Sequence, residues 1–488
     1  MKQQAFNPYL PSWEYIPDGE PHVFGDRVYV YGSHDHFGAP IFCVGDYVCW
    51  SAPVNDLSDW RMDGVIFRKN QDPKNRLGIR LLFAPDVCRG PDGRYYLYYA
   101  FDFMGLIGVA VCDEPAGHYE FLGHIRYPDH TLWGRRKGDQ FPFDPGVLAD
   151  EDGRIWLYSG FYTPTPRLLT GMKKLRNDGG VVAELEQDMV TLKSEPRLLF
   201  PKTGTGSFPD HEFFEASSIR KDKDRYLFVY SSRHNHELCY AVSNRPDGDF
   251  TFGGTLVSQG DLFLNGNTDE HHAANYLGNT HGGLLQLGED WYVFYHRQTN
   301  RHSYSRQACA EKLVRNPDGS FRQAEVTSCG LNGGPLSGLG TYEARIACNL
   351  WSAQGTGRYD GSGVRKKLKN HPYFTQTGKD REQDGDQYIA NMQNGAVAGF
   401  KYFATGEANQ IQVETSGHGC GYFEVFLDAG CKELAAEISV NPNGGKVVTN
   451  ASFTADKGIF PLFFRYQGTG SVNFHSFSLS VKTKETAE

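Results

Sequence analysis

Five polar side chains occupy nearly the same position in five successive segments of the chain. Each lies eight to ten residues before the Arg or Asp that follows a turn and leads into an aromatic-rich strand. The five residues are Asp18, Asp86, Asp144, Glu215 and His281. A single Asp before a strand is an ordinary turn or cap residue. The shared register is what makes this set a group of candidate catalytic residues.

Converging carboxylates suit the hydrolysis of a glycosidic bond. One carboxylic acid protonates the leaving oxygen, and one carboxylate either activates water, in an inverting enzyme, or attacks directly, in a retaining one. The acid must keep its proton near neutral pH, and a neighbouring carboxylate raises its pKa by like-charge repulsion. Three carboxylates can therefore act as base, acid and pKa tuner.

The segments that position these residues repeat one turn-and-strand pattern. The repeats are anchored at Arg27, Arg94, Arg154, Arg225 and Asp290, in steps of 67, 60, 71 and 65 residues. Five similar units of about four strands each, in roughly 320 residues, predict an all-β fold, a five-bladed β-propeller. The innermost strands of a propeller surround one central channel. We therefore expect the five polar residues to converge on a shared central pocket.

Composition and charge narrow the range of partners. The net charge is −9, so no basic excess is present to bind nucleic acid. No apolar run is long enough to span a membrane, and the N-terminus lacks the apolar core of a signal peptide. The ten cysteines are scattered without a CxxC pair, which is typical of reduced, buried thiols. We expect a cytoplasmic protein.

Six motifs follow one another along the first two thirds of the chain. They are IPDGEPHVFGDRVYVYGSHD, FAPDVCRGPDGRYYLYYA, FDPGVLADEDGRIWLYSG, EASSIRKDKDRYLFVYSS, THGGLLQLGEDWYVFYHR and YSRQACAEKL. Together they resemble glycoside hydrolase family 43 over about residues 5–325. The resemblance implies an inverting hydrolase on a five-bladed propeller, in a catalytic domain that we place at residues 1–327.

The resemblance also implies a role for each carboxylate. Asp18 is the general base, Glu215 the general acid, and Asp144 the pKa tuner that also orients the acid. The base motif departs from the Ala-Asp-Pro of many members, because here it is Pro-Asp-Gly-Glu-Pro. Glu20 is thus a second acid nearby and the first competitor of Asp18 for the role of base.

Further site residues follow from the same resemblance. Arg306 resembles the family arginine that reaches the sugar-binding subsite and pairs with a carboxylate. His281 resembles an axial histidine that in many members lies beside a calcium or other cation through water. Asp86 matches the Ala-Pro-Asp motif of the second blade, and we expect it to support the pocket and contact the substrate. No organic cofactor is implied, because water and carboxylates suffice for the chemistry.

Aromatic and histidine side chains near the acidic motifs are candidates for the rim of the pocket, since flat rings stack on sugars. We expect substrate contacts from His34, Phe37 and Phe141, and consider Trp13, Tyr15 and Trp133 as further rim residues. Ordinary packing inside the blades is the alternative for each of these aromatic residues.

The last third of the chain lacks the repeat. Residues 328–341 are Gly-rich and predict a linker, and residues 342–488 alternate in short strands that predict a β-sandwich of the jelly-roll, lectin-like type. This region resembles a family 6 carbohydrate-binding module. Tyr359, Tyr373 and Tyr388 are candidates for glycan contacts, with Trp351 as its one Trp. A structural role for this region, in which it braces the propeller or covers its rim, is as well supported as glycan binding.

Two other patterns fit no established site. His271, His272 and His281 do not have the spacing of a zinc site and no cysteine assists them. The Gly-rich segment at 355–363 lacks the Lys-Ser/Thr ending of a phosphate-binding loop and predicts an ordinary loop.

These observations predict an inverting exo-glycosidase that removes terminal pentose or furanose units from oligosaccharides derived from plant polysaccharides such as xylan. α-L-Arabinofuranosidase is the first choice and β-xylosidase the close second, with both activities in one enzyme a further option. Within the family, β-galactofuranosidase and an endo-acting arabinanase or xylanase stay open. Outside it, the alternatives are a fructan- or sucrose-cleaving propeller hydrolase, whose Asn-Asp-Pro-Asn-Gly motif is absent, and a non-catalytic glycan-binding propeller.

Overall fold

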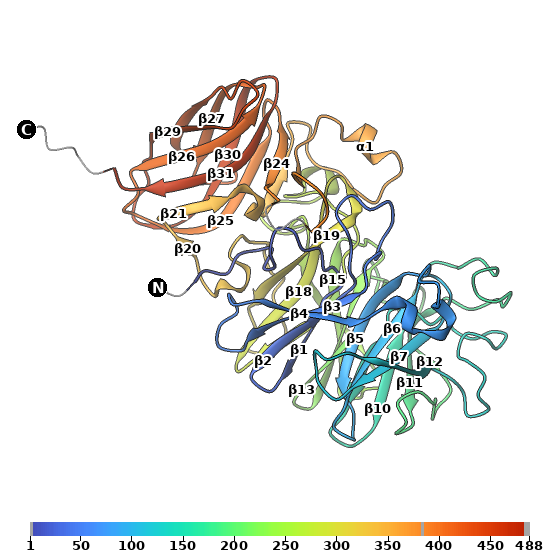
Figure 1. The fold of residues 1–488 in the computed structure, drawn as a ribbon. Coiled ribbons are helices and arrows are strands. Elements are labelled where there is room, and N and C mark those ends of the chain that lie inside the picture. Colours follow the sequence, from blue (N-terminus) through green and yellow to red (C-terminus); the bar gives the residue numbers. More distant parts are fainter. Residues whose placement is uncertain (1–2, 382–384, 483–488) are drawn as a thin grey trace, which may run out of the picture.

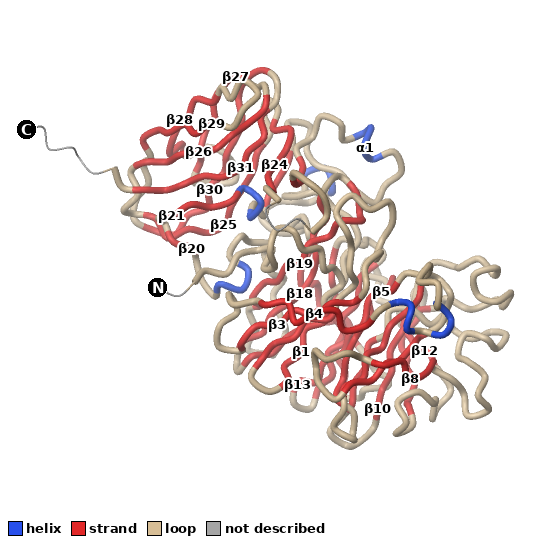
Figure 2. Tube along the Cα trace, in the orientation of Figure 1, coloured by secondary structure: helices blue, strands red, loops and turns tan. Residues whose placement is uncertain are grey.

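The structure is a computed structural model that describes residues 3–381 and 385–482. The chain forms two β-rich units, one blue to yellow and the other orange to red in Figure 1. Figure 2 shows that strands dominate both units. The described helices are α1 (Val364–Lys367) and five 3₁₀ turns, η1 (Lys69–Gln71), η2 (Pro73–Asn75), η3 (Glu270–His272), η4 (Gly330–Asn332) and η5 (Ala344–Ile346). Within the described chain, no helix has the length and apolar character needed to cross a membrane.

The first unit consists of five antiparallel sheets that follow one another along the chain, as the repeat predicts. The first is β1 (Glu20–Phe24), β2 (Arg27–Tyr31), β3 (Tyr47–Pro53) and β4 (Arg61–Phe67). The second is β5 (Leu82–Arg89), β6 (Tyr95–Phe101), β7 (Ile107–Cys112) and β8 (Glu120–His124). The third is β9 (Gly146–Ala149), β10 (Ile155–Ser159), β11 (Gly179–Leu185) and β12 (Arg197–Pro201). The fourth is β13 (Phe213–Asp222), β14 (Arg225–Ser232), β15 (Glu237–Ser243) and β16 (Thr251–Ser258), and the fifth is β17 (Leu284–Leu287), β18 (Asp290–Thr299) and β19 (His302–Leu313).

Local sequence explains the hairpins that begin each sheet. The turns between β5 and β6 and between β9 and β10 end in an Asp-Gly pair, where Gly93 and Gly153 have φ values of +86° and +83°. Glycine adopts such values without steric cost. The strands that follow are rich in Tyr and buried aliphatic residues, which favour a half-buried pleated surface.

The innermost strands close the ring. Strand β1 contacts β5 and β17, β5 contacts β9, β9 contacts β13, and β13 contacts β17. A parallel bridge between Gly19 and Gly282 joins the first sheet to the last. The predicted all-β class and five-bladed architecture are therefore confirmed.

The fifth sheet departs from the predicted four strands, because its described order contains three. The N-terminal segment lies along the free edge of β19 instead. The amide of Tyr9 donates to the carbonyl of Ala308 (3.2 Å), and Asn7 exchanges side-chain hydrogen bonds with the backbone of Ala310. The edge is thus covered by a segment from the other end of the propeller.

The second unit is a sandwich of two sheets. One contains β20 (Leu336–Ser337), β22 (Asn349–Trp351), β25 (Val397–Thr405), β30 (Gly458–Thr469), β27 (Cys420–Phe426) and β28 (Leu434–Val440). The other contains β21 (Gly340–Glu343), β23 (Tyr373–Gln376), β24 (Gln387–Met392), β31 (Val472–Ser480), β26 (Gln410–Gly417) and β29 (Val447–Ser452). Their inner faces meet in a buried aromatic cluster that includes Phe400, Phe423, Phe464, Phe474 and Phe477.

Residues 328–341, predicted as a linker, are part of the packed structure. They contain η4, β20 and the start of β21, and β20 pairs in parallel with β25. Leu331 and Leu336 are buried, and the amide of Ser328 donates to the carbonyl of Lys401 (2.7 Å). The glycines permit tight turns, but the apolar residues between them are drawn into the core of the two units.

The two units are joined by buried polar contacts. The ammonium of Lys401 lies 3.0 Å from carboxylate oxygens of Asp261 and of Glu325. The backbone of Tyr359 donates to the carbonyl of Leu277 (2.8 Å), and the carboxylate of Asp380 accepts from the amide of Phe37 (2.6 Å). The segment between β22 and β24 is thereby held against the propeller.

Candidate active site

The three predicted catalytic carboxylates lie at the starts of innermost strands. Asp18 lies two residues before β1 and Asp144 two residues before β9, whereas Glu215 is the third residue of β13. Asp18 and Asp144 have φ values of +58° and +46°, a left-handed conformation uncommon for residues other than glycine. Strand pairing shifts register on both sides of Glu215. Such irregularities re-aim side chains and are concentrated at functional sites.

These side chains line one pocket of about 180 Å³. Its polar lining also contains His281, Arg306, Asn235, Asn279 and Asp360. Its apolar wall consists of Phe42, Phe83, Phe103, Phe143, Phe161 and Phe214. An apolar wall with a few converging polar groups is the usual character of a small-molecule site. We call this space the catalytic pocket.

Asp18 is held as a carboxylate by a buried arginine. Nη1 of Arg306 donates to Oδ1 of Asp18 (2.9 Å), while Nε and Nη2 of Arg306 bind both oxygens of the buried Asp35 (2.8 and 3.1 Å). Burial works to raise the pKa of Asp18, but the charge of Arg306 opposes it and the net shift is downward. An ionised carboxylate beside the pocket can take a proton from water.

The surroundings of Glu215 shift its pKa in the direction opposite to that of Asp18. Burial and the negative charge of Asp18 raise the pKa of Glu215 to about 8, with Arg306 working in the other direction. The carboxyl therefore keeps its proton at neutral pH. Two carboxyl groups whose surroundings push their pKa values apart are the usual assignment of base and acid.

Asp144 lines the same pocket as these two groups. Its Oδ2 accepts a hydrogen bond from the amide of Ala216 (3.1 Å), the residue that follows Glu215. Burial, and then repulsion by Glu215 and Asp18, raise the pKa of Asp144 well above its usual range. Asp144 and Glu215 therefore titrate together as a pair. The bond to Ala216 also ties the backbone at Glu215 to the third blade.

Two histidines near the pocket floor are neutral at physiological pH. Burial lowers the pKa of His281 to about 4, and its Nδ1 lies 3.6 Å from Oδ2 of Asp144. Burial also lowers the pKa of His296 to about 3. Nε2 of His296 donates to the carbonyl of Asn279 (2.8 Å), so its Nδ1 is the acceptor for the amide of Asp18 (3.2 Å). His296 therefore fixes the backbone of Asp18.

Glu20, the competitor for the role of base, is outside the lining of the catalytic pocket. Its Oε2 accepts hydrogen bonds from Nη2 of Arg220 (2.7 Å) and Oγ of Ser218 (3.0 Å). It lies further along the axis, where its Oε1 is 3.9 Å from Nε2 of His281. The geometry favours Asp18 as the group that faces the substrate.

Asp86 is also outside the catalytic pocket, contrary to the expectation of a substrate contact. One oxygen pairs with Nε2 of His22 (2.7 Å), and the other accepts from the amide of Val147 (2.8 Å) in the third blade. Asp86 lies inside β5 rather than before it, and this places it deeper along the axis than Asp18 or Asp144. It joins two blades.

The predicted rim residues His34, Phe37 and Phe141 do not line the pocket either. The ring nitrogens of His34 bind the carbonyl of Asp46 (2.9 Å) and Nη1 of Arg381 (2.6 Å). Phe37 stacks near Tyr15 at a centroid distance of 6.0 Å. Phe141 is buried behind Phe143 and Phe161, with centroid distances of 6.0 and 5.9 Å. Trp13, Tyr15 and Trp133 are likewise absent from the lining.

The sequence contains some signal for the residues that were missed. Phe143 and Phe214 immediately precede Asp144 and Glu215, so the motifs themselves place an aromatic ring beside each carboxyl group. His296 lies inside the buried strand β18, where a polar residue is unusual. Asp35 and Asp360 carry no such local signal.

One group of potential metal ligands lies on the propeller axis. Ligand atoms of Glu20, His22 and Asp86 lie within 4.8 Å of one another. Oε1 of Glu20 is buried and has no hydrogen-bond partner among the described residues. An oxygen without a partner in this position is compatible with a cation or a water molecule.

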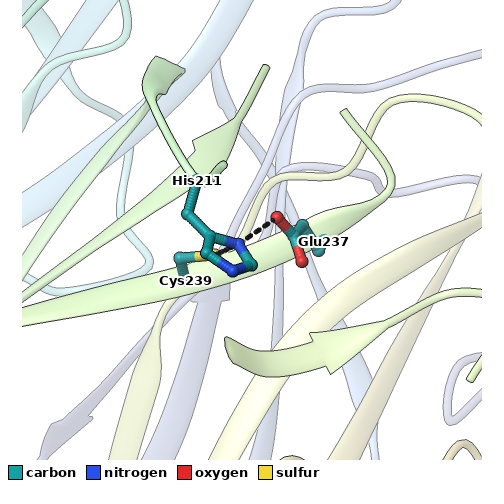
Figure 3. A group of neighbouring side chains, drawn as sticks. All are labelled: His211, Glu237 and Cys239. Carbon is teal, nitrogen blue, oxygen red and sulfur yellow. Dashed lines mark hydrogen bonds and ion pairs between the residues drawn. The ribbon is translucent and has the colours of Figure 1, made fainter. Parts of the chain in front are cut away.

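A second group of potential ligands lies on the fourth blade and consists of His211, Glu237 and Cys239 (Figure 3). Nδ1 of His211 lies 2.8 Å from Oε1 of Glu237, while Ser232 and Thr255 donate their hydroxyls to the same carboxylate (2.6 and 3.2 Å). Burial raises the pKa of the Cys239 thiol well above its usual range. A satisfied carboxylate and a protonated thiol make this a structural ion pair that anchors the segment leading into β13.

Comparison with known proteins places these features among sugar-cleaving enzymes. A family model described as "Glycosyl hydrolases family 43" matches residues 16–321. A "Xylosidase/arabinosidase" of Thermoclostridium stercorarium is 47% identical over 483 residues, covering 98% of this chain and 99% of that protein. An "Arabinoxylan arabinofuranohydrolase" of Bacillus subtilis is 25% identical over 421 residues, covering 81% and 74%.

A solved structure has a similar fold over part of the chain. The crystal structure of the GH43_1 enzyme from Xanthomonas citri complexed with xylose is 24% identical with a TM-score of 0.50. The match covers 64% of this chain and 90% of that one. At this identity the match bears on the fold alone.

Proposed function

The chain belongs to glycoside hydrolase family 43, and on that premise we propose that it removes terminal α-L-arabinofuranosyl or β-D-xylosyl units from oligosaccharides with inversion of configuration. It is a glycoside hydrolase, and the relative that is 47% identical along nearly its whole length bears the name xylosidase/arabinosidase. The observation that carries the proposal is the pairing, in one pocket, of an ionised Asp18 with a protonated Glu215.

In the proposed mechanism, Glu215 donates its proton to the glycosidic oxygen while the bond from that oxygen to the anomeric carbon breaks. Asp18 takes a proton from a water molecule as the water oxygen attacks the anomeric carbon from the opposite face. The products are the free sugar in inverted configuration and the shortened oligosaccharide, and the proton on Asp18 passes to solvent as Glu215 is reprotonated. Burial and the charge of Asp18 keep the pKa of the acid high. Asp144 accepts the hydrogen bond from the amide of Ala216 and so fixes the backbone beside Glu215.

The shape of the site supports an exo-acting enzyme. The catalytic pocket has a volume of about 180 Å³, and Asp360 from the second unit contributes to its wall. Ligand sites of drug size occupy about 300–1,000 Å³. A pocket below that range suits one terminal sugar better than the interior of a chain.

We also propose a cation on the axis, held by Glu20 and, through water, by His281. The unpartnered Oε1 of Glu20 and the nearby Nε2 of His281 fit an ion such as calcium. A bound cation would supply positive charge that favours the ionised form of the nearby carboxylates. Treatment with a chelator, followed by addition of Ca²⁺, should lower and then restore the melting temperature. An unchanged melting temperature contradicts the cation site.

The function is tested with a panel of aryl glycosides. The panel contains α-L-arabinofuranoside, β-D-xyloside, β-D-galactofuranoside and β-D-fructofuranoside, each incubated with the wild type and with Asp18→Asn. We expect release from one or both of the first two, and its loss in the variant. Release of only the third or fourth sugar contradicts the proposed substrate, and an equally active variant contradicts the base.

A further inference from the structure

A second cavity adjoins the catalytic pocket. It has a volume of about 530 Å³ and shares two lining residues, Phe42 and Asp360, with that pocket. Residues 301–304 of the propeller form one side, and residues 359–366, which include part of α1, form the other. We call this space the interdomain cavity. Because it shares these two residues with the catalytic pocket, it is positioned for the part of the substrate that leaves.

The interdomain cavity contains buried polar atoms that lack protein partners. Among the described residues, Oγ of Ser303, Oη of Tyr359 and Nε of Arg301 are buried and form no hydrogen bond. Ser303 and Tyr359 are only 4% and 3% exposed. Burying such groups without partners costs free energy. Hydroxyl groups of a sugar would satisfy all three atoms, since a hydroxyl both donates and accepts.

Aromatic rings supply an apolar surface in the same cavity. Phe42 and Tyr304 contact each other edge to face at a centroid distance of 4.8 Å. Both are partly exposed and both line the cavity. Arg306, which binds Asp18, also lies over the ring of Phe42, 4.9 Å from its centroid. The surface formed by Phe42 is therefore continuous from the catalytic carboxylate into the interdomain cavity.

The charge of the interdomain cavity is positive. Arg301, Arg365 and Lys366 line it, and Asp360 is its one acidic lining residue. The carboxylate of Asp360 is already neutralised by Arg358, with a contact of 2.8 Å. Arg365 and Lys366 are exposed and form no ion pair within the described chain. The cavity thus has unpaired cations in a protein whose net charge is −9.

We propose that the interdomain cavity binds the leaving part of the substrate and selects leaving groups that carry a carboxylate, as in oligosaccharides with a uronic acid substituent. The inference rests on the proposed function. It assigns the second unit a role in specificity, because Tyr359, Arg365 and Lys366 all belong to it. A carboxylate would pair with Arg365 and Lys366, while sugar hydroxyls would meet Ser303 and Tyr359.

The test compares kcat/KM for two substrates, a neutral xylo-oligosaccharide and the same oligosaccharide with one uronic acid on its leaving portion. The wild type should prefer the acidic substrate. In the double variant Arg365→Glu/Lys366→Glu, kcat/KM for the acidic substrate divided by kcat/KM for the neutral one should fall about five- to tenfold. This is the effect expected when two exposed ion pairs with the substrate are lost. The preference of the wild type should also decrease as salt is raised.

Lys367→Glu is the matched control, because Lys367 is an exposed neighbour that does not line the cavity. It should keep the ratio of the wild type. The proposal is overturned if the wild type shows no preference, or if Lys367→Glu lowers the ratio as much as the double variant. A wild type that cleaves the neutral substrate without preference leaves the proposed function intact, whereas one that cleaves neither substrate overturns both.

Discussion

Nη1 of Arg306 lies 2.9 Å from Oδ1 of Asp18, although 288 residues separate them in the chain. The same guanidinium binds both oxygens of Asp35, so one buried cation faces two buried carboxylates. This arrangement keeps Asp18 ionised in a place where burial alone would favour its neutral form. Burial and the ionised Asp18 in turn raise the pKa of Glu215, which forms no hydrogen bond with Arg306 in the described structure, so Glu215 retains its proton.

Asp18→Asn should abolish base catalysis while preserving the fold. The amide keeps the size of the carboxylate but cannot take a proton from water. We expect kcat to fall by about 10²–10⁴-fold, the usual contribution of a general base. Steady-state kinetics on an aryl β-xyloside or α-arabinofuranoside measures the effect, with Glu20→Gln as the comparison. A larger loss in Glu20→Gln than in Asp18→Asn would transfer the role of base to Glu20.

The activity should depend on pH at both limits. Glu215 must be protonated, so kcat/KM should fall as pH rises through about 8, where its carboxyl ionises. Asp18 must be ionised, so activity should also fall in acid, at a pH below the usual range for Asp because its pKa is lowered. A profile of kcat/KM against pH checks both limits. If activity already decreased as the pH rose above about 5, Glu215 would not be protonated at neutral pH and the assignment would be contradicted.

Arg306 should control the acid limit of that profile. Arg306→Lys keeps a positive charge near Asp18, whereas Arg306→Met removes it and raises the pKa of Asp18. We expect the acid limit to move to higher pH in Arg306→Met and to stay closer to that of the wild type in Arg306→Lys. Arg306→Met should also lose about 3–5 kcal/mol of stability, because Asp35 is left buried without its partner. An unmoved acid limit in a folded Arg306→Met protein would separate Arg306 from the ionisation of Asp18.

The contact between the two units should contribute strongly to stability. Lys401 is 4% exposed and binds Asp261 and Glu325 at 3.0 Å. Lys401→Ala leaves Asp261 as a buried charge without a partner, so we expect a loss of about 3–5 kcal/mol in the free energy of unfolding. Denaturant unfolding measures this loss. Lys432→Ala, at an exposed position of the second unit, is the control and should have almost no effect.

The sequence predicts the architecture well because the propeller depends on local signals. Turn residues and aromatic strands recur in every blade, and their register fixes which strand is innermost. Register alone does not determine how deep a side chain lies along the axis. Asp86 lies eight residues before Arg94, nearly the register of Asp18, which lies nine before Arg27. Yet Asp86 lies within β5 and binds His22 and Val147 instead of facing the pocket.

Other parts of the site depend on contacts that no local pattern encodes. Asp35 meets Arg306 only when the first and last blades come together. Asp360 reaches the catalytic pocket from the second unit, in a Gly-rich segment that the sequence identifies as a loop without indicating its destination. The packing of the predicted linker is another contact of this kind, because Leu331 is buried in a core cluster of the propeller and Leu336 in the core of the sandwich.

The most direct test of the assignment of Asp18 as base and Glu215 as acid is to measure how much activity Glu215→Gln loses on substrates with different leaving groups. A good leaving group, such as dinitrophenolate, departs without protonation, whereas the alcohol of an oligosaccharide needs a proton from the acid. We predict that Glu215→Gln loses about 10²–10⁴-fold in kcat/KM on the oligosaccharide and much less on the dinitrophenyl glycoside of the same sugar. Equal losses on both substrates would show that Glu215 is not the general acid and would contradict the account.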